Sequence, residues 1–457
     1  MDVPMTVAAF RASSHFGLGP RPGEIEAIEA LGAEDWLARQ LVGRPLPAAL
    51  AELAPSHVTL SEMLAFQRSR SMMRQDNEGP ALSALDYVRS TMLPQFESRL
   101  DAAVASEDGF RERLVAFWSN HFTVSTAGAR MLIASSCVAY ENEAIRARLD
   151  GSFAGMLRAV VQHPVMLAYM DNLDSFAANS ELGRARGRGV NENLAREVLE
   201  LHTLGVGGGY DHRDMRGLAA LLSGWRMGRD GDDSGRFRFR HEGHDSAAVE
   251  LLGRRYEKPG LQRGEAALDD LARHPSTARF LATKLARHFG GEPVDQRVVE
   301  AIVRAFVATD GDLPSIHRTL IEQLLDVGVK QQKMRTPNDF LVAALRGLDF
   351  AGALREPSHE LNRLETLAAM GQFPFQAPSP AGWPDSVEHW GAPTALLQRI
   401  DWAHGVAARL GSRVRPTALA GFMLPPWAEG SRRAVAAAES SAQGLTLLLA
   451  APEFQWR

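Results

Sequence analysis

Apolar residues recur at helical spacing through most of this chain, and this periodicity is the feature that most limits its possible folds. The spacing is clear in Ala27, Ile28 and Leu31, and again in RFLATKLARHF (279–289) and RVVEAIVRAFVA (297–308). Such spacing places the apolar side chains on one face of a helix. Because 45% of the 457 residues are hydrophobic, the chain can bury a large interior. We therefore expect an all-α protein in which many helices surround a single core.

One short stretch departs from the helical pattern. In RFRFRH (236–241), Phe237 and Phe239 fall on the same side of an extended segment, which predicts a strand. We expect a short β-hairpin-like arm near residues 236–256. The chain is expected to form one unit, 1–457, and the Gly- and Asp-rich stretch 229–235 marks a possible subdivision into helical parts 1–228 and 236–457.

Composition excludes several classes of protein. The chain has 50 Lys and Arg residues against 55 Asp and Glu residues, a formal charge of −5, which argues against nucleic acid as its main partner. A single cysteine, Cys137, excludes an intrachain disulfide framework. No apolar run approaches the roughly 18 residues of a membrane-spanning helix, and the first residues lack the pattern of a signal peptide. We expect a cytoplasmic protein, and export together with a partner stays open.

Residues 190–210, VNENLAREVLELHTLGVGGGY, contain the most informative polar pattern. The stretch predicts a helix of about four turns, with Asn193, Glu197 and Glu200 within about 60° of one another around its axis. Two carboxylates at this spacing can bind a divalent cation, or act together in proton transfer. The alternative is a solvated face stabilised by pairs such as Glu192 with Arg196. His202 falls about 160° away from Glu200, which favours a core histidine that is hydrogen-bonded through its ring.

Three further groups of residues are candidates. Arg184, Arg186 and Arg188 precede this helix in an expected loop and are either an anion-binding site or a mobile surface loop. In FWSNHFTVS (117–125), Asn120 and His121 lie at an expected helix end, where His121 is either a ligand or acid–base group or a packed core histidine. The pair His244–Asp245 could bind a metal ion or orient a base. Nucleophile-elbow, zinc-protease and EF-hand motifs are not found.

Ten segments in this order resemble bacterial family 1800 of the domains of unknown function (DUF1800), over nearly the whole chain. The segments are FGLGPRPGEIEAI (16–28), FWSNHFTVS (117–125), MLAYMDNLDS (166–175), VNENLAREVLELHTLGVGGGYDHRDM (190–215), LLSGW (221–225), HD (244–245) with LLG (251–253), FLATKLARHF (280–289), MRTPNDFLVAALRGL (334–348), MGQFPFQAPSPAGWPD (370–385) and LLAAPEFQWR (448–457). The resemblance implies a predominantly helical protein without an established activity. It also implies a partner, because genes of this family often neighbour those of family 1501, whose members resemble alkaline phosphatases and sulfatases.

The family motifs match this chain with three departures. Ser119 stands where the family usually has the first histidine of FWHNHF, and Ala247 and Val249 replace the glycine and lysine of HD-x-G-x-K. The NEN-x-ARE-x-x-ELHTLGV pattern is complete, so the resemblance implies a buried polar site at Asn193, Glu197 and Glu200. We expect His121 and the His244–Asp245 pair to meet that site from other helices. The losses at Ser119 and Val249 suggest that an activity of the family is altered in this member.

Two principal hypotheses follow. The first is an enzyme in which Glu197, Glu200 and His121 are catalytic, whose reaction and substrate are unknown. Its substrate would contact Asn193, Asn120 and the three arginines, and a divalent metal ion would bind Glu197, Glu200, His121, His244 and Asp245. The second is a non-catalytic binding or maturation partner of a family 1501 protein, in which the acidic face is a hydrogen-bonded structural network. A third, an anion-binding module at Arg184, Arg186 and Arg188, has less support.

Overall fold

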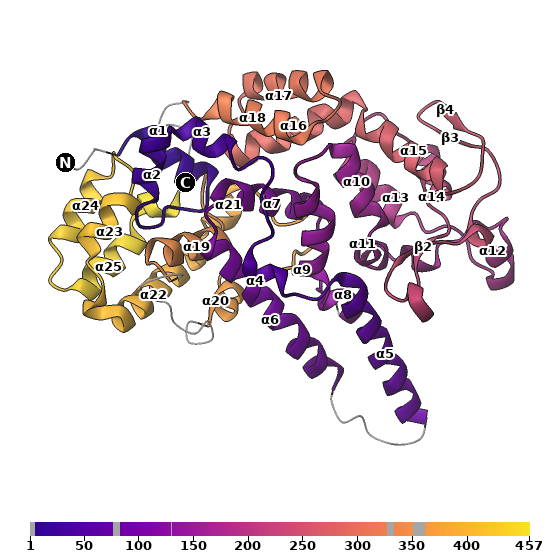
Figure 1. Cartoon of the computed structure of the whole chain (residues 1–457), viewed down its shortest axis with the longest axis horizontal. Helices are drawn as coiled ribbons and strands as arrows, with labels where there is room; N and C mark the ends of the chain where they lie inside the picture. Colours follow the sequence, from indigo (N-terminus) through magenta and orange to yellow (C-terminus); the bar gives the residue numbers. More distant parts are fainter. Residues whose placement is uncertain (1–4, 76–82, 129, 327–332, 351–361) are drawn as a thin grey trace.

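A computed structural model of the protein describes residues 5–75, 83–128, 130–326, 333–350 and 362–457. Helices dominate, as the periodicity predicts, and they form an elongated body with one projecting helical hairpin (Figure 1). The N-terminal part comprises α1 (Val7–Phe10), the π-helical segment η1 (Arg11–Phe16), α2 (Glu24–Leu31), α3 (Ala33–Ala38) and α4 (Ala48–Ala51). The projecting hairpin consists of α5 (Ser56–Gln75) and α6 (Ala84–Ala105).

The central part surrounds α7 (Gly109–His121), which lies in the middle of the body (Figure 1). It continues through α8 (Met131–Ala134), α9 (Cys137–Tyr140), the π-helical η2 (Glu141–Ile145), α10 (Phe153–Gln162), α11 (Pro164–Tyr169), α12 (Glu181–Arg186), α13 (Asn193–Glu197), the π-helical η5 (Val198–His202) and α14 (His212–Leu221). The upper edge in Figure 1 is formed by α15 (Leu261–Ala272), α16 (Pro275–Gly290), α17 (Gln296–Ala308) and α18 (Leu313–Leu324). The C-terminal part comprises α19 (Pro337–Gly347), α20 (Arg363–Ala369), α21 (Val387–Trp390), α22 (Pro393–Leu410), α23 (Pro416–Met423), α24 (Glu429–Ala436) and α25 (Ser441–Ala450).

The predicted strand is present, and the β structure is slightly more extensive than expected. Strand β2 (Phe237–Phe239) pairs antiparallel with β1 (Trp225–Met227), with Trp225 opposite Phe239. A separate hairpin joins β3 (Val249–Leu251) to β4 (Arg254–Tyr256). The expected arm near 236–256 therefore contains one strand of the first pair and the whole of the second.

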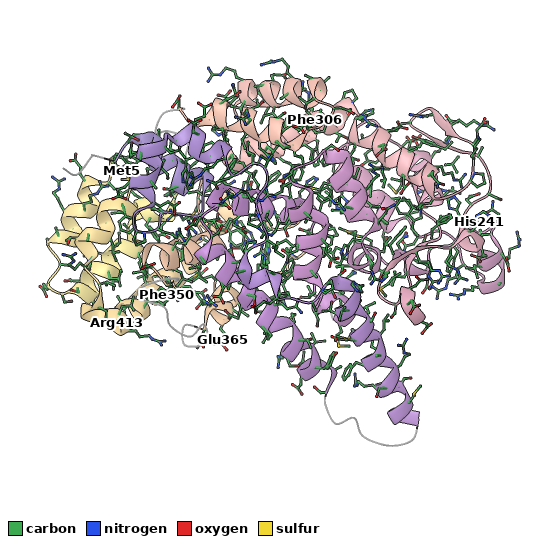
Figure 2. All side chains as sticks on the ribbon, in the orientation of Figure 1. Met5, His241, Phe306, Phe350, Glu365 and Arg413 are labelled. Atoms are coloured by element: carbon green, nitrogen blue, oxygen red, sulfur yellow. The ribbon has the colours of Figure 1, made fainter. Side chains whose placement is uncertain are left out.

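Buried apolar side chains form one cluster that extends from Ala9 to Phe454 and includes residues of every major part of the body. Figure 2 shows how densely side chains fill the space between the ribbons. Cys137 lies in this core with no exposed surface, as a small apolar residue would. None of the described helices combines the length and the apolar character needed to cross a lipid bilayer.

The helix expected within residues 190–210 is present but irregular, and it is shorter than the predicted four turns because α13 and η5 together span residues 193–202. Asn191 Oδ1 accepts a hydrogen bond from the backbone amide of Asn193 at 2.9 Å, and α13 continues directly into the wider turn of η5. Thr203 Oγ1 donates to the carbonyl of Val198, five residues earlier, at 2.6 Å and so closes that turn. Three π-helical segments occur in the described chain, and each contacts α7 or its last residue, His121. Such π-helical segments are frequent at functional sites, so we expect a functional site near α7.

Candidate functional site

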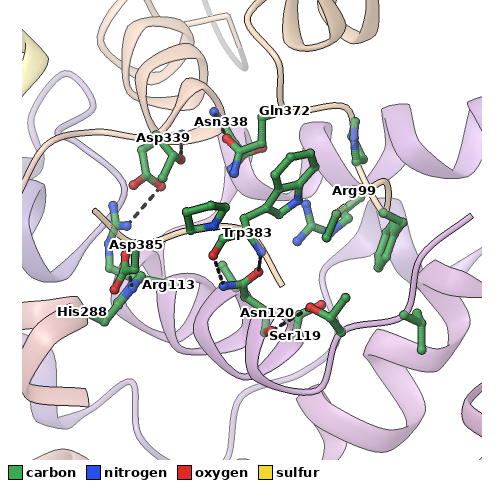
Figure 3. A pocket seen from close by; sticks show the side chains of 18 residues that line it. Arg99, Arg113, Ser119, Asn120, His288, Asn338, Asp339, Gln372, Trp383 and Asp385 are labelled. Atoms are coloured by element: carbon green, nitrogen blue, oxygen red, sulfur yellow. Dashed lines mark hydrogen bonds and ion pairs between the residues drawn. The ribbon is translucent and has the colours of Figure 1, made fainter. Parts of the chain in front are cut away.

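The C-terminal half of α7 borders a cavity of about 110 Å³, here called the first cavity (Figure 3). Four segments that are far apart in the sequence meet there, namely the end of α7, the end of α16, the start of α19 and residues 372–385, and Arg99 of α6 completes the lining. Its polar lining residues are Arg99, Arg113, Ser119, Asn120, Thr123, His288, Thr336, Asn338, Asp339, Gln372 and Asp385. The cavity is therefore a place where charged and amide side chains gather inside a large helical protein.

Arg113 and Asp339 form the buried centre of this lining. Arg113 donates to the carbonyl of Gly17 at 2.7 Å and to Asp339 Oδ1 at 3.1 Å, and Arg457 Nε lies 3.3 Å from Asp339 Oδ2. Thr336 caps α19 by accepting the amide of Asp339, which holds the carboxylate in the first turn of that helix. Burial opposes ionisation of Asp339, but the two guanidinium groups outweigh it and lower its pKa to about 2.

Positive charge exceeds negative charge around Asp339. Two carboxylates, Asp339 and Asp385, lie among five largely buried cations: Arg113, Lys333, Arg335, Arg399 and Arg457. Burial lowers the pKa of Arg335 and of Arg457 to about 9, so both side chains remain charged at neutral pH. Several buried charges are thus left without a counter-charge from a side chain of the cluster, which makes the neighbourhood electropositive.

His288 and Asp385 provide a paired imidazole and carboxylate at the edge of the first cavity. His288 Nδ1 lies 3.4 Å from Asp385 Oδ1, and Lys333 Nζ lies 2.9 Å from the same oxygen. Arg457 donates to His288 Nε2 at 3.3 Å, so the Nδ1 atom carries the proton and faces Asp385. Burial lowers the pKa of His288 to about 4, although Asp385 opposes this shift, and the ring is neutral at pH 7.

Residues 372–385 are fastened to α7 by Asn120. Its side-chain amide donates to the carbonyl of Trp383 at 3.0 Å, and its oxygen accepts the Trp383 amide at 2.7 Å (Figure 3). Gly382 is required beside this clamp because its φ is +85° and a Cβ atom would lie 2.5 Å from the carbonyl oxygen of Asn120. Asn120, predicted to bind substrate, therefore holds against α7 a segment that lines the cavity.

Ser119 lies in the same cavity, at the position of the missing family histidine. Its hydroxyl is hydrogen-bonded to Glu141, the first residue of η2, and Glu141 accepts two hydrogen bonds from Arg99 at 2.8 and 2.9 Å. Burial opposes ionisation of Glu141, but Arg99 outweighs it and the pKa is lowered. The departure from the family motif thus falls directly on the lining of the first cavity.

A second cavity of about 290 Å³ adjoins the first and shares Asn120, His288, Trp383, Pro384 and Asp385 with it. His121 and Lys284 both line it, and Lys284 Nζ lies 3.0 Å from His121 Nδ1. His121 is buried, and burial together with Lys284 lowers its pKa well below the ordinary value. Of the three residues predicted to be catalytic, His121 is the one that lines either cavity.

The predicted acidic face lies elsewhere and is partly exposed. Asn193 is exposed, and Glu197 and Glu200 are half-buried. Burial and the neighbouring Glu200 raise the pKa of Glu197, while burial and a hydrogen bond to Glu200 raise the pKa of Tyr210 to about 12. Neither glutamate lines the two cavities, so the structure does not unite this face with His121.

His202 is a core histidine, as predicted, but its ring is not hydrogen-bonded to any described residue. It has no exposed surface, and its ring packs 5.1 Å from that of Phe122. Burial lowers its pKa to about 3, which keeps the ring neutral. The backbone carbonyl of His202, rather than its ring, forms a hydrogen bond: it accepts from His121 Nε2 at 3.2 Å.

The remaining candidates, His244 and Asp245, are engaged in hydrogen bonds with nearby residues. His244 Nδ1 donates to the Ser223 carbonyl at 2.8 Å and Nε2 accepts from Arg263 at 2.9 Å, so both ring nitrogens are occupied. Asp245 accepts the side chain of Asn179 at 3.0 Å and the amide of Ala247 at 2.8 Å. Over the part of the chain that the structure describes, no three His, Cys, Asp or Glu side chains are grouped so that they could hold a metal ion.

The three arginines lie largely on a short helix rather than in the expected loop. Ser180 caps α12 by accepting the amide of Gly183, and Gly187 ends it with a φ of +60°. Arg184 donates to the carbonyl of Asn179, whereas Arg186 and Arg188 lie 3.5 and 4.0 Å from Asp174. All three side chains are exposed and belong to the protein surface, away from both cavities.

A comparison with known families identifies the chain. The family described as "Protein of unknown function (DUF1800)" matches residues 11–456. The chain belongs to the DUF1800 family. No curated protein and no solved structure shows a significant match. Four of the segments by which this DUF1800 member resembles its family, 117–125, 280–289, 334–348 and 370–385, supply lining residues of the first cavity.

Sequence reasoning missed the charged residues that make this site. Arg113, Lys284, His288, Asp339 and Asp385 were not singled out, because they are far apart in the sequence and no motif spacing links them. The family resemblance could have indicated four of these five residues, because all except Arg113 lie in the segments that resemble the family. The four segments that meet at the first cavity would have indicated where those residues converge.

Proposed function

We propose that this DUF1800 protein is an enzyme that binds a small anionic substrate in the first cavity and transforms it by general acid–base catalysis. The observation that carries the proposal is the excess of buried cations around Asp339. An anion bound beside Arg113 would offset this charge, and the positive field would attract it. Asn338 and Gln372 would add amide groups for neutral parts of the substrate.

Proton transfer is assigned to His288. A neutral imidazole accepts a proton more readily when a carboxylate holds its other nitrogen, and Asp385 occupies that position. Lys333 supports the ionised form of Asp385 through an ion pair of 2.9 Å. The substrate would compete with Arg457 for His288 Nε2, because that contact is long at 3.3 Å.

Binding is tested by titrating the full chain with inorganic phosphate and with oxalate in an isothermal titration calorimeter. Ala116 lines the first cavity from α7, so Ala116→Leu should fill it and weaken binding at least about tenfold. Ala65→Leu places the same side chain on an exposed position of α5 and is the matched control. Equal affinity in the two variants would contradict the proposal.

Chemistry is tested with a panel of small carboxylates and phosphate monoesters, each followed by proton NMR. Conversion by the wild-type protein should fall at least about a hundredfold in His288→Gln while phosphate affinity is retained. Gln keeps a hydrogen-bonding side chain but cannot exchange a proton at neutral pH. Conversion that persists in His288→Gln would contradict the assignment.

A second proposal is a binding role toward a family 1501 protein, and the projecting α5–α6 hairpin favours it (Figure 1). The hairpin exposes Met72 and Leu85, which have 62% and 53% of their surface accessible. Exposed apolar side chains on a projection are suited to contact with another protein. Co-purification of the two proteins, lost in Leu85→Glu and retained in Ala65→Glu, is the expected result.

A further inference from the structure

Lys284 occupies an unusual position in the second cavity. It is one of only four lysines in the chain, with Lys258, Lys330 and Lys333. Its side chain is partly buried and lines the cavity together with His121 and Arg287, and its ammonium group lies over the ring of Phe280 at 5.5 Å. Asp385 acts electrostatically on Lys284 and lines the same cavity, but its carboxylate forms an ion pair of 2.9 Å with Lys333 Nζ. The amine therefore faces a cavity whose carboxylate is already engaged by another lysine.

His121 fixes the orientation of the Lys284 amine. The carbonyl of His202 can only accept, so the 3.2 Å contact shows that His121 Nε2 carries the ring proton. His121 Nδ1 then has a lone pair and accepts from Lys284 Nζ at 3.0 Å. A neutral Lys284 amine would keep this hydrogen bond as the donor, and its own lone pair would remain available toward the cavity.

Burial also favours the neutral form of Lys284. It lowers the pKa of the amine to about 8, although Asp385 partly opposes the shift. A substantial fraction of the side chain is then unprotonated slightly above neutral pH, which is the condition for a nucleophilic lysine. Lys333, by comparison, is engaged by both the carboxylate and the carbonyl of Asp385.

We infer that Lys284 is a carbonyl-reactive residue that forms an imine with a small aldehyde or ketone in the second cavity. The nitrogen lone pair forms a bond to the carbonyl carbon while the carbonyl π electrons move to oxygen. The two protons of the amine pass to that oxygen, which leaves as water and gives the C=N bond. No oxidant or reductant is consumed. The inference goes beyond the proposed function and rests on the contact between Lys284 and His121 rather than on anion binding.

The inference is tested on the full wild-type chain with propionaldehyde, a neutral probe, and sodium cyanoborohydride, which reduces an imine to a stable propylamine. Peptide mass spectrometry then gives the rate of labelling at each lysine, and the exposed Lys258 is the internal standard. At pH 7.5 we expect Lys284 to react at least about tenfold faster than Lys258, because burial lowers the pKa of Lys284 to about 8 and leaves part of its amine unprotonated. A rate at Lys284 equal to or below that of Lys258 would overturn the inference.

The pH dependence of labelling provides a second test that needs no variant. The rate at Lys284 should rise with a midpoint near pH 8, as its lowered pKa requires. A midpoint near pH 10, as for a solvated lysine, would contradict the inference. Lys284→Arg should remove the label from that peptide alone. Because propionaldehyde is uncharged, failure of this experiment and failure of phosphate binding in the first cavity are separate results.

Discussion

Two polar regions of this protein differ in how they are built. The region around the first cavity joins side chains from four distant segments through buried contacts such as those of Arg113 with Asp339 and Asp339 with Arg457. The acidic face of Asn193, Glu197 and Glu200 lies on α13 and the adjoining η5, and these side chains are exposed or half-buried. Regular spacing on one helix thus indicated a polar surface, whereas the buried site arises where separate segments meet.

The largest expected difference between the regions concerns pH. Buried histidines around α7 have strongly lowered pKa values, among them His202 and His317 at about 3 and His288 at about 4. In the unfolded chain these histidines have a pKa near 6.5, so below that pH they bind protons, whereas the buried histidines of the folded chain stay neutral. The free energy of unfolding therefore falls as the pH falls toward 4. Each such histidine contributes up to about 1.4 kcal/mol per pH unit.

Urea unfolding at pH 7, 6 and 5 measures this loss in the free energy of unfolding. For the buried histidines around α7 together, the loss should reach several kcal/mol. His317 Nε2 accepts from Trp118 at 3.2 Å, and His317→Gln should reduce the slope. The control variant is His404→Gln, which removes an exposed histidine of α22. A stability that is flat between pH 7 and 5 would show that the histidines around α7 titrate normally.

Asp339→Asn should lower the free energy of unfolding by about 3–5 kcal/mol, because Arg113 and Arg457 would lose their shared buried counter-charge. The matched control is Asp174→Asn on the surface, where Arg186, Arg188 and Arg229 lie 3.5 to 4.0 Å from a partly exposed carboxylate. That change should cost at most about 1 kcal/mol. Equal effects in chemical denaturation would remove the distinction between the two regions.

Gly382→Ala should destabilise the protein by about 2–4 kcal/mol, since it combines an unfavourable backbone conformation with a collision against Asn120. Gly371→Ala separates the two causes, because Gly371 has a φ of +83° and nothing within 4 Å of an added Cβ. It should cost only about 1–2 kcal/mol. If thermal unfolding shows the same shift for both variants, the clamp between Asn120 and residues 372–385 contributes little.

The smallest effect is expected at the predicted acidic face. Glu200→Gln retains an acceptor for Tyr210 and removes a charge that raises the pKa of Glu197. Stability at pH 7 should change by no more than about 0.5 kcal/mol, and the pKa of Glu197 should fall. NMR titration of the Glu197 carboxyl carbon measures the shift, and an unchanged pKa would mean that the two carboxylates do not interact.

Much of the fold follows from the sequence, and the site follows only in part. Helical periodicity predicted the all-α architecture, and Phe237 and Phe239 predicted strand β2, because both patterns depend on neighbours in the sequence. The π-helical turn at Val198–His202 was not predicted, since the closing contact of Thr203 with Val198 has no periodic signature. His121 was identified, whereas its partner Lys284 was not, because 163 positions separate them and tertiary packing alone brings them together.

The proposal that the first cavity binds an anion has a direct structural test. It is tested most directly by soaking crystals of the protein in selenate, a tetrahedral anion whose selenium is located by anomalous scattering. We expect a selenium peak in the first cavity within hydrogen-bonding distance of Arg113, and we expect this peak to be lost in Ala116→Leu crystals. Selenate bound at Arg184, Arg186 and Arg188 with an empty first cavity would contradict the account.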